Sequence, residues 1–198
     1  MTTLAAVKKG KRLCIASDSL ALFGFRKEIT GIHVEDEGKI IQIGPNYVGI
    51  AGHPSWNLIF THYFSKEKKI NEWKTPDQIF DVFNLLHRDL KDLYHFSPSY
   101  SRYESFESSD LGLLIVNSHG IFEVDYLRTV RQFSQFSAMG TGEEYALGAI
   151  GAIYSILDDV AEITKVGIEA AIQFDKNTEG PLDIHIIDSP HGRIVNAL

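Results

Sequence analysis

The sequence has 198 residues, of which 44% are hydrophobic and 23% are charged, and its formal net charge at pH 7 is −7. These values are typical of one soluble globular domain, and the acidic balance argues against a general nucleic-acid binder, which usually carries a basic face. Residues 1–14 contain several basic residues and no apolar run is as long as a membrane span, so we expect no signal peptide and no membrane partner. The single cysteine, Cys14, excludes an internal disulfide and favours a cytoplasmic location.

The first part of the chain predicts short strands. Apolar runs separated by Gly, Pro, Asn and Lys turns are typical of an antiparallel meander. We expect its strands at residues 4–7, 13–16, 39–43 and 47–51.

Two helices are predicted next, at residues 54–64 and from residue 75 onwards. Thr75 is a good N-cap, Pro76 suits the first helical position, and Gln78 can complete a capping box. Apolar residues then recur at spacings of three and four, which predicts one buried helix face. This face consists of Ile79, Phe83, Leu86, Leu90 and Leu93.

After an aperiodic segment at 96–109, which we expect to be an exposed loop, the pattern of strands and helices repeats. Strands are predicted at 111–116, 120–125, 131–138, 182–187 and 193–195. A turn at Gly140-Thr141-Gly142 leads into a third helix, and residues 161–174 form a fourth. The apolar face of the third helix comprises Leu147, Ile150, Tyr154 and Leu157. Grouped strands and grouped helices without a linker predict one α+β domain over 1–198, with helices packed on antiparallel sheets.

Several short stretches carry a resemblance to a known family. They are Thr2-Thr3-Leu4, Ile15-Ala16-Ser17-Asp18-Ser19, Lys39-Ile40-Ile41-Gln42-Ile43, Gly49-Ile50-Ala51-Gly52, Met139-Gly140-Thr141-Gly142 and residues 175–180. In this order and at this spacing, the chain resembles β-type proteasome subunits and the bacterial ring protease HslV, and among them the small bacterial homologues that begin at Met-Thr-Thr. The resemblance implies a four-layer αββα sandwich of the Ntn-hydrolase type, with two antiparallel sheets between helix layers.

Thr2 is the expected nucleophile once Met1 is removed. A threonine hydroxyl needs a base, and a free α-amine with an ordinary pKa of about 7.7–8.0 can serve as one at neutral pH. Nucleophile and base would then belong to one residue, already oriented. Taken by itself, a Met-Thr start also occurs by chance.

The resemblance gives three further residues a direct part in catalysis. Lys39 would be the ammonium beside the threonine hydroxyl and amine, Asp18 would hold Lys39, and the Gly52 N–H would bind the oxyanion. Taken alone, Asp18 and Lys39 could form an ordinary surface pair, and Gly52 could be a turn glycine.

Thr141, Asp175 and Thr178 would orient the free amine, although Thr141 stands where the family usually has serine. The substrate pocket would involve Ala21, Leu22, Glu37, Ile50 and Pro54. The segment 25–38 is longer than in the family and contains three consecutive acidic residues, which we interpret as an exposed charged turn in preference to an acidic pocket.

The sequence predicts no metal site and no cofactor, because the eight histidines are scattered and no phosphate-binding loop is present. By resemblance, the chain is a threonine endopeptidase that acts on peptides or unfolded proteins inside homo-oligomeric stacked rings, hexameric or heptameric, with an ATP-driven AAA+ unfoldase as a further partner. Two alternatives stay open: an Ntn amidase acting on a small amide, and a non-catalytic ring subunit.

Overall fold

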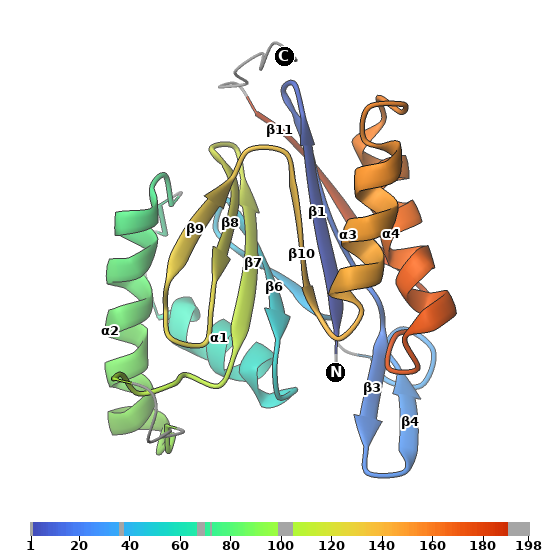
Figure 1. The fold of residues 1–198 in the computed structure, drawn as a ribbon. Coiled ribbons are helices and arrows are strands. Elements are labelled where there is room, and N and C mark those ends of the chain that lie inside the picture. Colours follow the sequence, from blue (N-terminus) through green and yellow to red (C-terminus); the bar gives the residue numbers. More distant parts are fainter. Residues whose placement is uncertain (1, 36–37, 67–69, 72, 99–104, 190–198) are drawn as a thin grey trace.

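Two antiparallel sheets face each other in the computed structural model, which describes residues 2–35, 38–66, 70–71, 73–98 and 105–189 (Figure 1). The first sheet has the order β10 (Phe136–Gly140), β1 (Thr3–Lys9), β2 (Arg12–Ser17) and β11 (Asp183–Asp188). The second has the order β5 (Ile40–Ile43), β6 (Asn46–Ala51), β7 (Gly112–Asn117), β8 (Gly120–Val124) and β9 (Val130–Phe133).

Helices cover the outer face of each sheet. The pair α3 (Glu143–Ile153) and α4 (Val160–Phe174) lies against the first sheet, and α1 (Ser55–Ser65) and α2 (Pro76–Tyr94) lie against the second (Figure 1). Three apolar clusters fill the spaces between the four layers. The predicted αββα sandwich is therefore confirmed.

Strand β1 lies at the centre of this arrangement and is buried on both faces. Its residues alternate, so Leu4 and Ala6 enter the cluster between the sheets, whereas Ala5 and Val7 enter the cluster under α3 and α4. All four side chains are fully buried. Such burial explains why the strand appears in the sequence as a continuous apolar run.

The structure corrects the prediction of one strand over 131–138. This stretch forms two strands, β9 and β10, which belong to different sheets. Ser134 and Gln135 lie between them and carry the chain from one sheet to the other. Continuous strand propensity could not reveal this crossing, because each half alone still looks like a strand.

A hairpin was not predicted. Strands β3 (Leu20–Phe23) and β4 (Arg26–Ile29) pair with each other, and β4 lies inside the segment 25–38 that was expected to be an exposed charged turn. Gly24, with φ of +63°, makes the reversal between them. The hairpin projects from the sandwich at the end where β1 begins (Figure 1).

Helix α2 begins as predicted but differs in detail. The Thr75 hydroxyl accepts a hydrogen bond from the Gln78 N–H at 3.3 Å, whereas the Gln78 side chain accepts from the Lys74 N–H instead of completing the box on Thr75. The apolar face is buried from Ile79 to Leu90, but Leu93 is 61% exposed, because the face continues at Tyr94, four residues after Leu90, which packs against the core.

Helix α3 ends at Ile153, so Tyr154 and Leu157 pack on the core from the segment after the helix. The loop expected to be exposed is buried at its end, at Ser108 and Ser109. The predicted strand at 193–195 lies outside the described residues. Within the described parts of the chain, no helix is both long enough and apolar enough to cross a membrane.

Candidate active site

The candidate site lies at the amino end of β1. Thr2 is 5% exposed and Thr3 is fully buried. Continuing the alternation of β1 places Thr2 on the face of Leu4, between the sheets, and Thr3 on the face of Ala5, toward α3 and α4. The side chains of the two threonines therefore face different layers of the sandwich, although the residues are adjacent in sequence.

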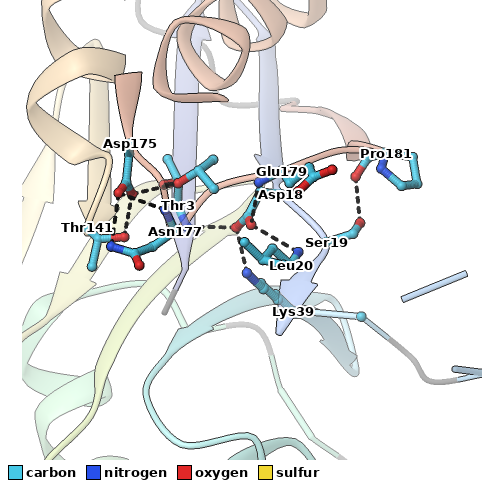
Figure 2. Close-up of polar contacts among 12 residues, drawn as sticks. Thr3, Asp18, Ser19, Leu20, Lys39, Thr141, Asp175, Asn177, Glu179 and Pro181 are labelled. Carbon is cyan, nitrogen blue, oxygen red and sulfur yellow. Dashed lines mark hydrogen bonds and ion pairs between the residues drawn. The ribbon is translucent and has the colours of Figure 1, made fainter. Parts of the chain in front are cut away.

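Asp18, just after β2, is the central acceptor of the site (Figure 2). Its Oδ1 accepts from the Thr3 N–H at 2.8 Å and from the Lys39 ammonium at 2.6 Å. Its Oδ2 accepts from the N–H groups of Leu20 at 3.1 Å and Glu179 at 3.3 Å. The carboxylate is fully buried, and these four donors compensate its charge.

Lys39 reaches this carboxylate from the other sheet, because it directly precedes β5. Its carbonyl accepts from the Ile50 N–H on β6 at 2.9 Å, which fixes its backbone. Burial lowers the pKa of Lys39 below its ordinary value, and the negative charge of Asp18 opposes this effect. The predicted Asp18–Lys39 pair is therefore present, and it is a buried pair that bridges the two sheets.

Asp175 organises a second cluster beside β1, in the loop after α4. Its Oδ2 accepts from the Thr141 hydroxyl at 2.5 Å and from the Thr178 hydroxyl at 2.8 Å. Burial alone would raise the pKa of Asp175, but hydrogen bonds from Thr141, Asn177 and Thr178 lower it overall. The three residues that the resemblance grouped around the amine therefore lie together.

The glycines on either side of Thr141 let β1 approach this turn. The Thr141 N–H donates to the Thr2 carbonyl at 2.9 Å. A Cβ on Gly140, where φ is +103°, would lie 1.9 Å from the Thr2 oxygen, and one on Gly142 would lie 2.4 Å from the Thr3 hydroxyl. Gly140 and Gly142 are therefore needed because β1 passes too close for a side chain at either position, and not only because the chain turns there.

Gly140→Ala is expected to destabilise the protein by about 3 kcal/mol or more, because strained φ and a backbone clash combine. The matched control is Gly148→Ala in α3, where a Cβ meets nothing within 4 Å and helix propensity predicts a gain of about 0.5–1 kcal/mol. Thermal unfolding at equal protein concentration compares the two variants. Equal stability of the two would contradict this account of the turn.

Gly52 follows β6, two residues after the contact between Ile50 and Lys39. A Cβ there would lie 2.8 Å from Cδ1 of Trp56, so the position has no room for a side chain. Packing of Trp56 thus explains this glycine independently of any role of its N–H in catalysis.

The predicted pocket residues are spread along neighbouring elements. Ala21 and Leu22 are half-buried on β3, and Pro54 is exposed just before α1. Ile50 is 4% exposed and packs in the core beneath α1 and α2, so only its exposed edge can meet a substrate. Glu37 lies outside the described residues.

Sequence reasoning missed Thr3 and Glu179 as members of the site. Thr3 contributes its N–H to Asp18, and its hydroxyl lies 2.6 Å from the Thr178 hydroxyl. Glu179 contributes its N–H to Asp18, and its side chain pairs with Lys27 of the hairpin. The alternation of β1 was a signal for Thr3, because it turns this side chain toward the helices that carry Asp175.

Solved structures similar to this chain include two of BPH from Thiobacillus denitrificans. The structure of BPH from Thiobacillus denitrificans has a TM-score of 0.87 and 36% sequence identity, covering 96% of this chain and 100% of that one. A structure of Thiobacillus denitrificans BPH in complex with epoxomicin matches with a TM-score of 0.87 and 35% identity over 94% and 98% of the two chains.

A eukaryotic HslV from Trypanosoma brucei is similar at the level of fold, with a TM-score of 0.62 and 19% identity over 94% of this chain and 99% of that one. No protein-family model and no curated protein matches the chain.

Proposed function

This chain belongs to the proteasome β-type and HslV-like family of N-terminal-nucleophile peptidases, together with the bacterial proteasome homologue BPH, and we propose that it hydrolyses peptide bonds with Thr2 as nucleophile. One observation supports this most strongly: a single oxygen of Asp18 accepts both the Lys39 ammonium and the N–H that follows Thr2. A cation is thereby held beside the main chain of the proposed nucleophile.

The proposed reaction starts when removal of Met1 leaves Thr2 with a free α-amine. The amine takes the proton of the Thr2 hydroxyl while the oxygen attacks the carbonyl carbon of the scissile peptide bond. The tetrahedral intermediate collapses as the C–N bond breaks, and the leaving amine receives that proton. Water then attacks the ester on Thr2 by the same route and releases the acid and free Thr2.

Lys39 would act as a fixed positive charge in this sequence. The ammonium disfavours a proton on the neighbouring amine and stabilises the developing negative charge on the hydroxyl oxygen. The Gly52 N–H would bind the oxyanion, and Thr141, Asp175 and Thr178 would orient the amine. The buried Asp18–Lys39 pair also favours a peptidase over the small-amide alternative, since family amidases usually lack the lysine.

We further propose that the peptidase works inside homo-oligomeric stacked rings in the cytoplasm, on peptides or unfolded chains, with an AAA+ unfoldase as a candidate partner. Exposed aromatic side chains on the outer helix layer support an assembly. Tyr145 and Phe174 are 44% and 67% exposed and pack with ring centroids 5.7 Å apart, and Ile156, at the opposite end of the same helix pair, is 72% exposed.

A mass experiment tests this proposal. The intact mass of the purified protein is expected to lack Met1, and its native mass is expected to be a multiple of six or seven subunits. The protein should cleave fluorogenic peptide amides, and epoxomicin, which BPH binds, should inhibit it. Retention of Met1 in protein that still cleaves peptides would contradict the proposed base, and a monomeric native mass would contradict the ring.

A further inference from the structure

We propose that Thr3 is a positioning residue for the Thr2 nucleophile and acts through a directed chain of hydroxyl groups; this inference rests on the proposed peptidase function. Thr3 is fully buried beside the cluster around Asp175, and no role follows for it from the sequence or from the comparisons.

The direction of the hydrogen bonds in this chain follows from their chemistry. Asp175 has a lowered pKa and is a carboxylate at neutral pH, so it can only accept. Thr178 therefore donates its one hydroxyl proton to Asp175 at 2.8 Å. The Thr178 oxygen is then left as an acceptor, and the Thr3 hydroxyl, 2.6 Å away, must be its donor.

The peptide group between Thr2 and Thr3 is fixed at three points. Its carbonyl accepts from the Thr141 N–H at 2.9 Å, and its N–H donates to Asp18 at 2.8 Å. The third point is the Thr3 side chain, held by Thr178. Since this peptide group carries the α-carbon of Thr2, fixing it limits how far the hydroxyl and amine of Thr2 can move relative to Lys39.

The residues around Thr3 provide space and a hydrogen-bond partner for its hydroxyl group. Gly142 leaves the space that this hydroxyl occupies, because a Cβ there would lie 2.4 Å from the Thr3 oxygen and 3.2 Å from the Thr178 oxygen. The other side chains of β1 on this face, Ala5 and Val7, are apolar. A valine of similar shape would satisfy packing alone, so the buried hydroxyl indicates a polar role.

Thr3→Val removes the donor while keeping a branched side chain. We expect kcat to fall about tenfold with KM changed by less than about twofold, because positioning of the nucleophile is lost and the substrate pocket is not. Without the Thr3 donor, Thr178 becomes a weaker donor to Asp175, and the less compensated carboxylate attracts the α-amine proton more strongly. The acidic limb of the kcat/KM pH profile should therefore move to higher pH.

Thr3→Ser is the rescue variant, because it restores the hydroxyl, and it should return both kcat and the pH profile toward those of the parent protein. Thr164→Val is the matched structural control. Thr164 is also fully buried and donates to the Val160 carbonyl at 2.6 Å within α4, away from the site, so its loss should lower stability without moving the pH profile.

Both kinetic readouts are taken on the assembled fraction after a check of its native mass. Unchanged kcat and pH profile in folded Thr3→Val would overturn the role of Thr3, as would equal defects in Thr3→Val and Thr3→Ser. If Thr3→Val does not assemble, Thr3→Ala also removes the donor and should shift the acidic limb in the same direction, whereas Thr3→Ser should not. An active Thr2→Ala variant would instead refute the peptidase mechanism itself, which keeps the two failures distinguishable.

Discussion

Thr2→Ala is expected to abolish peptide hydrolysis, with a loss in kcat on the order of 10³-fold or more, because no other group supplies the attacking oxygen in the proposed reaction. The fold should survive the change. The structural contact of Thr2 runs through its carbonyl, which accepts from Thr141, and alanine keeps that carbonyl. Hydrolysis of a fluorogenic peptide amide and the native mass of the same sample measure the two effects together.

Thr2→Ser is the matched variant for this experiment, since it retains both a hydroxyl and an α-amine and should keep measurable activity. The pair separates the chemistry of the hydroxyl from any effect of altered packing at a site that is only 5% exposed. Full activity in Thr2→Ala, after intact mass has verified the substitution and the absence of Met1, would rule out Thr2 as nucleophile.

Lys39→Met should reduce kcat by about 10²–10³-fold, because it removes the positive charge proposed to stabilise the developing alkoxide and to keep the amine unprotonated. Methionine retains much of the apolar stem, so the change tests mainly the charge. The Asp18 carboxylate then stays buried without its cation, and we expect a loss of stability of about 3 kcal/mol. Peptide hydrolysis and thermal unfolding at matched concentration measure these effects.

Lys9→Met provides the control for Lys39→Met. Lys9 is also a partly buried lysine paired with a carboxylate, since it contacts Asp158 at 2.9 Å, but it lies at the other end of β1. Its removal leaves Asp158 and the carbonyls of Tyr154 and Leu157 without this donor, so we expect some loss of stability but no change in kcat. A Lys39→Met variant that keeps more than a tenth of the parent activity would contradict the role proposed for the ammonium.

The pH dependence of activity in the parent protein tests whether the Lys39 ammonium is needed. Burial places the pKa of Lys39 below 10.5, so the ammonium is lost at lower pH than that of an exposed lysine. If the reaction needs this ammonium, activity should decline on the alkaline side at a lower pH than the ordinary pKa of an exposed lysine would give. The acidic limb, in contrast, would report protonation of the Thr2 amine.

Local patterns in the sequence were sufficient for most elements. The helix start at Thr75 and Pro76 depends on residues within one turn, and it appears where predicted. The apolar strand from 4 to 7 is also local, because its residues are buried whichever partner they meet. Leu93 was wrongly assigned to the buried face, because Tyr94, four residues after Leu90, packs against the core in its place.

Several features were decided by pairings between distant segments. The split of 131–138 into β9 and β10 depends on which sheet each half joins, and the β3–β4 hairpin depends on a turn at Gly24 that the charged residues around it obscured. Both features depend on which strand each segment pairs with and in which register, and neighbouring residues in the sequence do not determine this.

The sequence by itself determined the buried strands, most helix boundaries and, through resemblance, the set of candidate residues that includes Thr2, Asp18 and Lys39. Only the tertiary structure decided that one oxygen of Asp18 joins Lys39 to β1, and that Thr3 links β1 to Thr178. The physical reason is that these contacts span 15 to 175 residues of chain, so they exist only after distant segments have packed together, and the Asp18–Lys39 contact also needs both sheets in place.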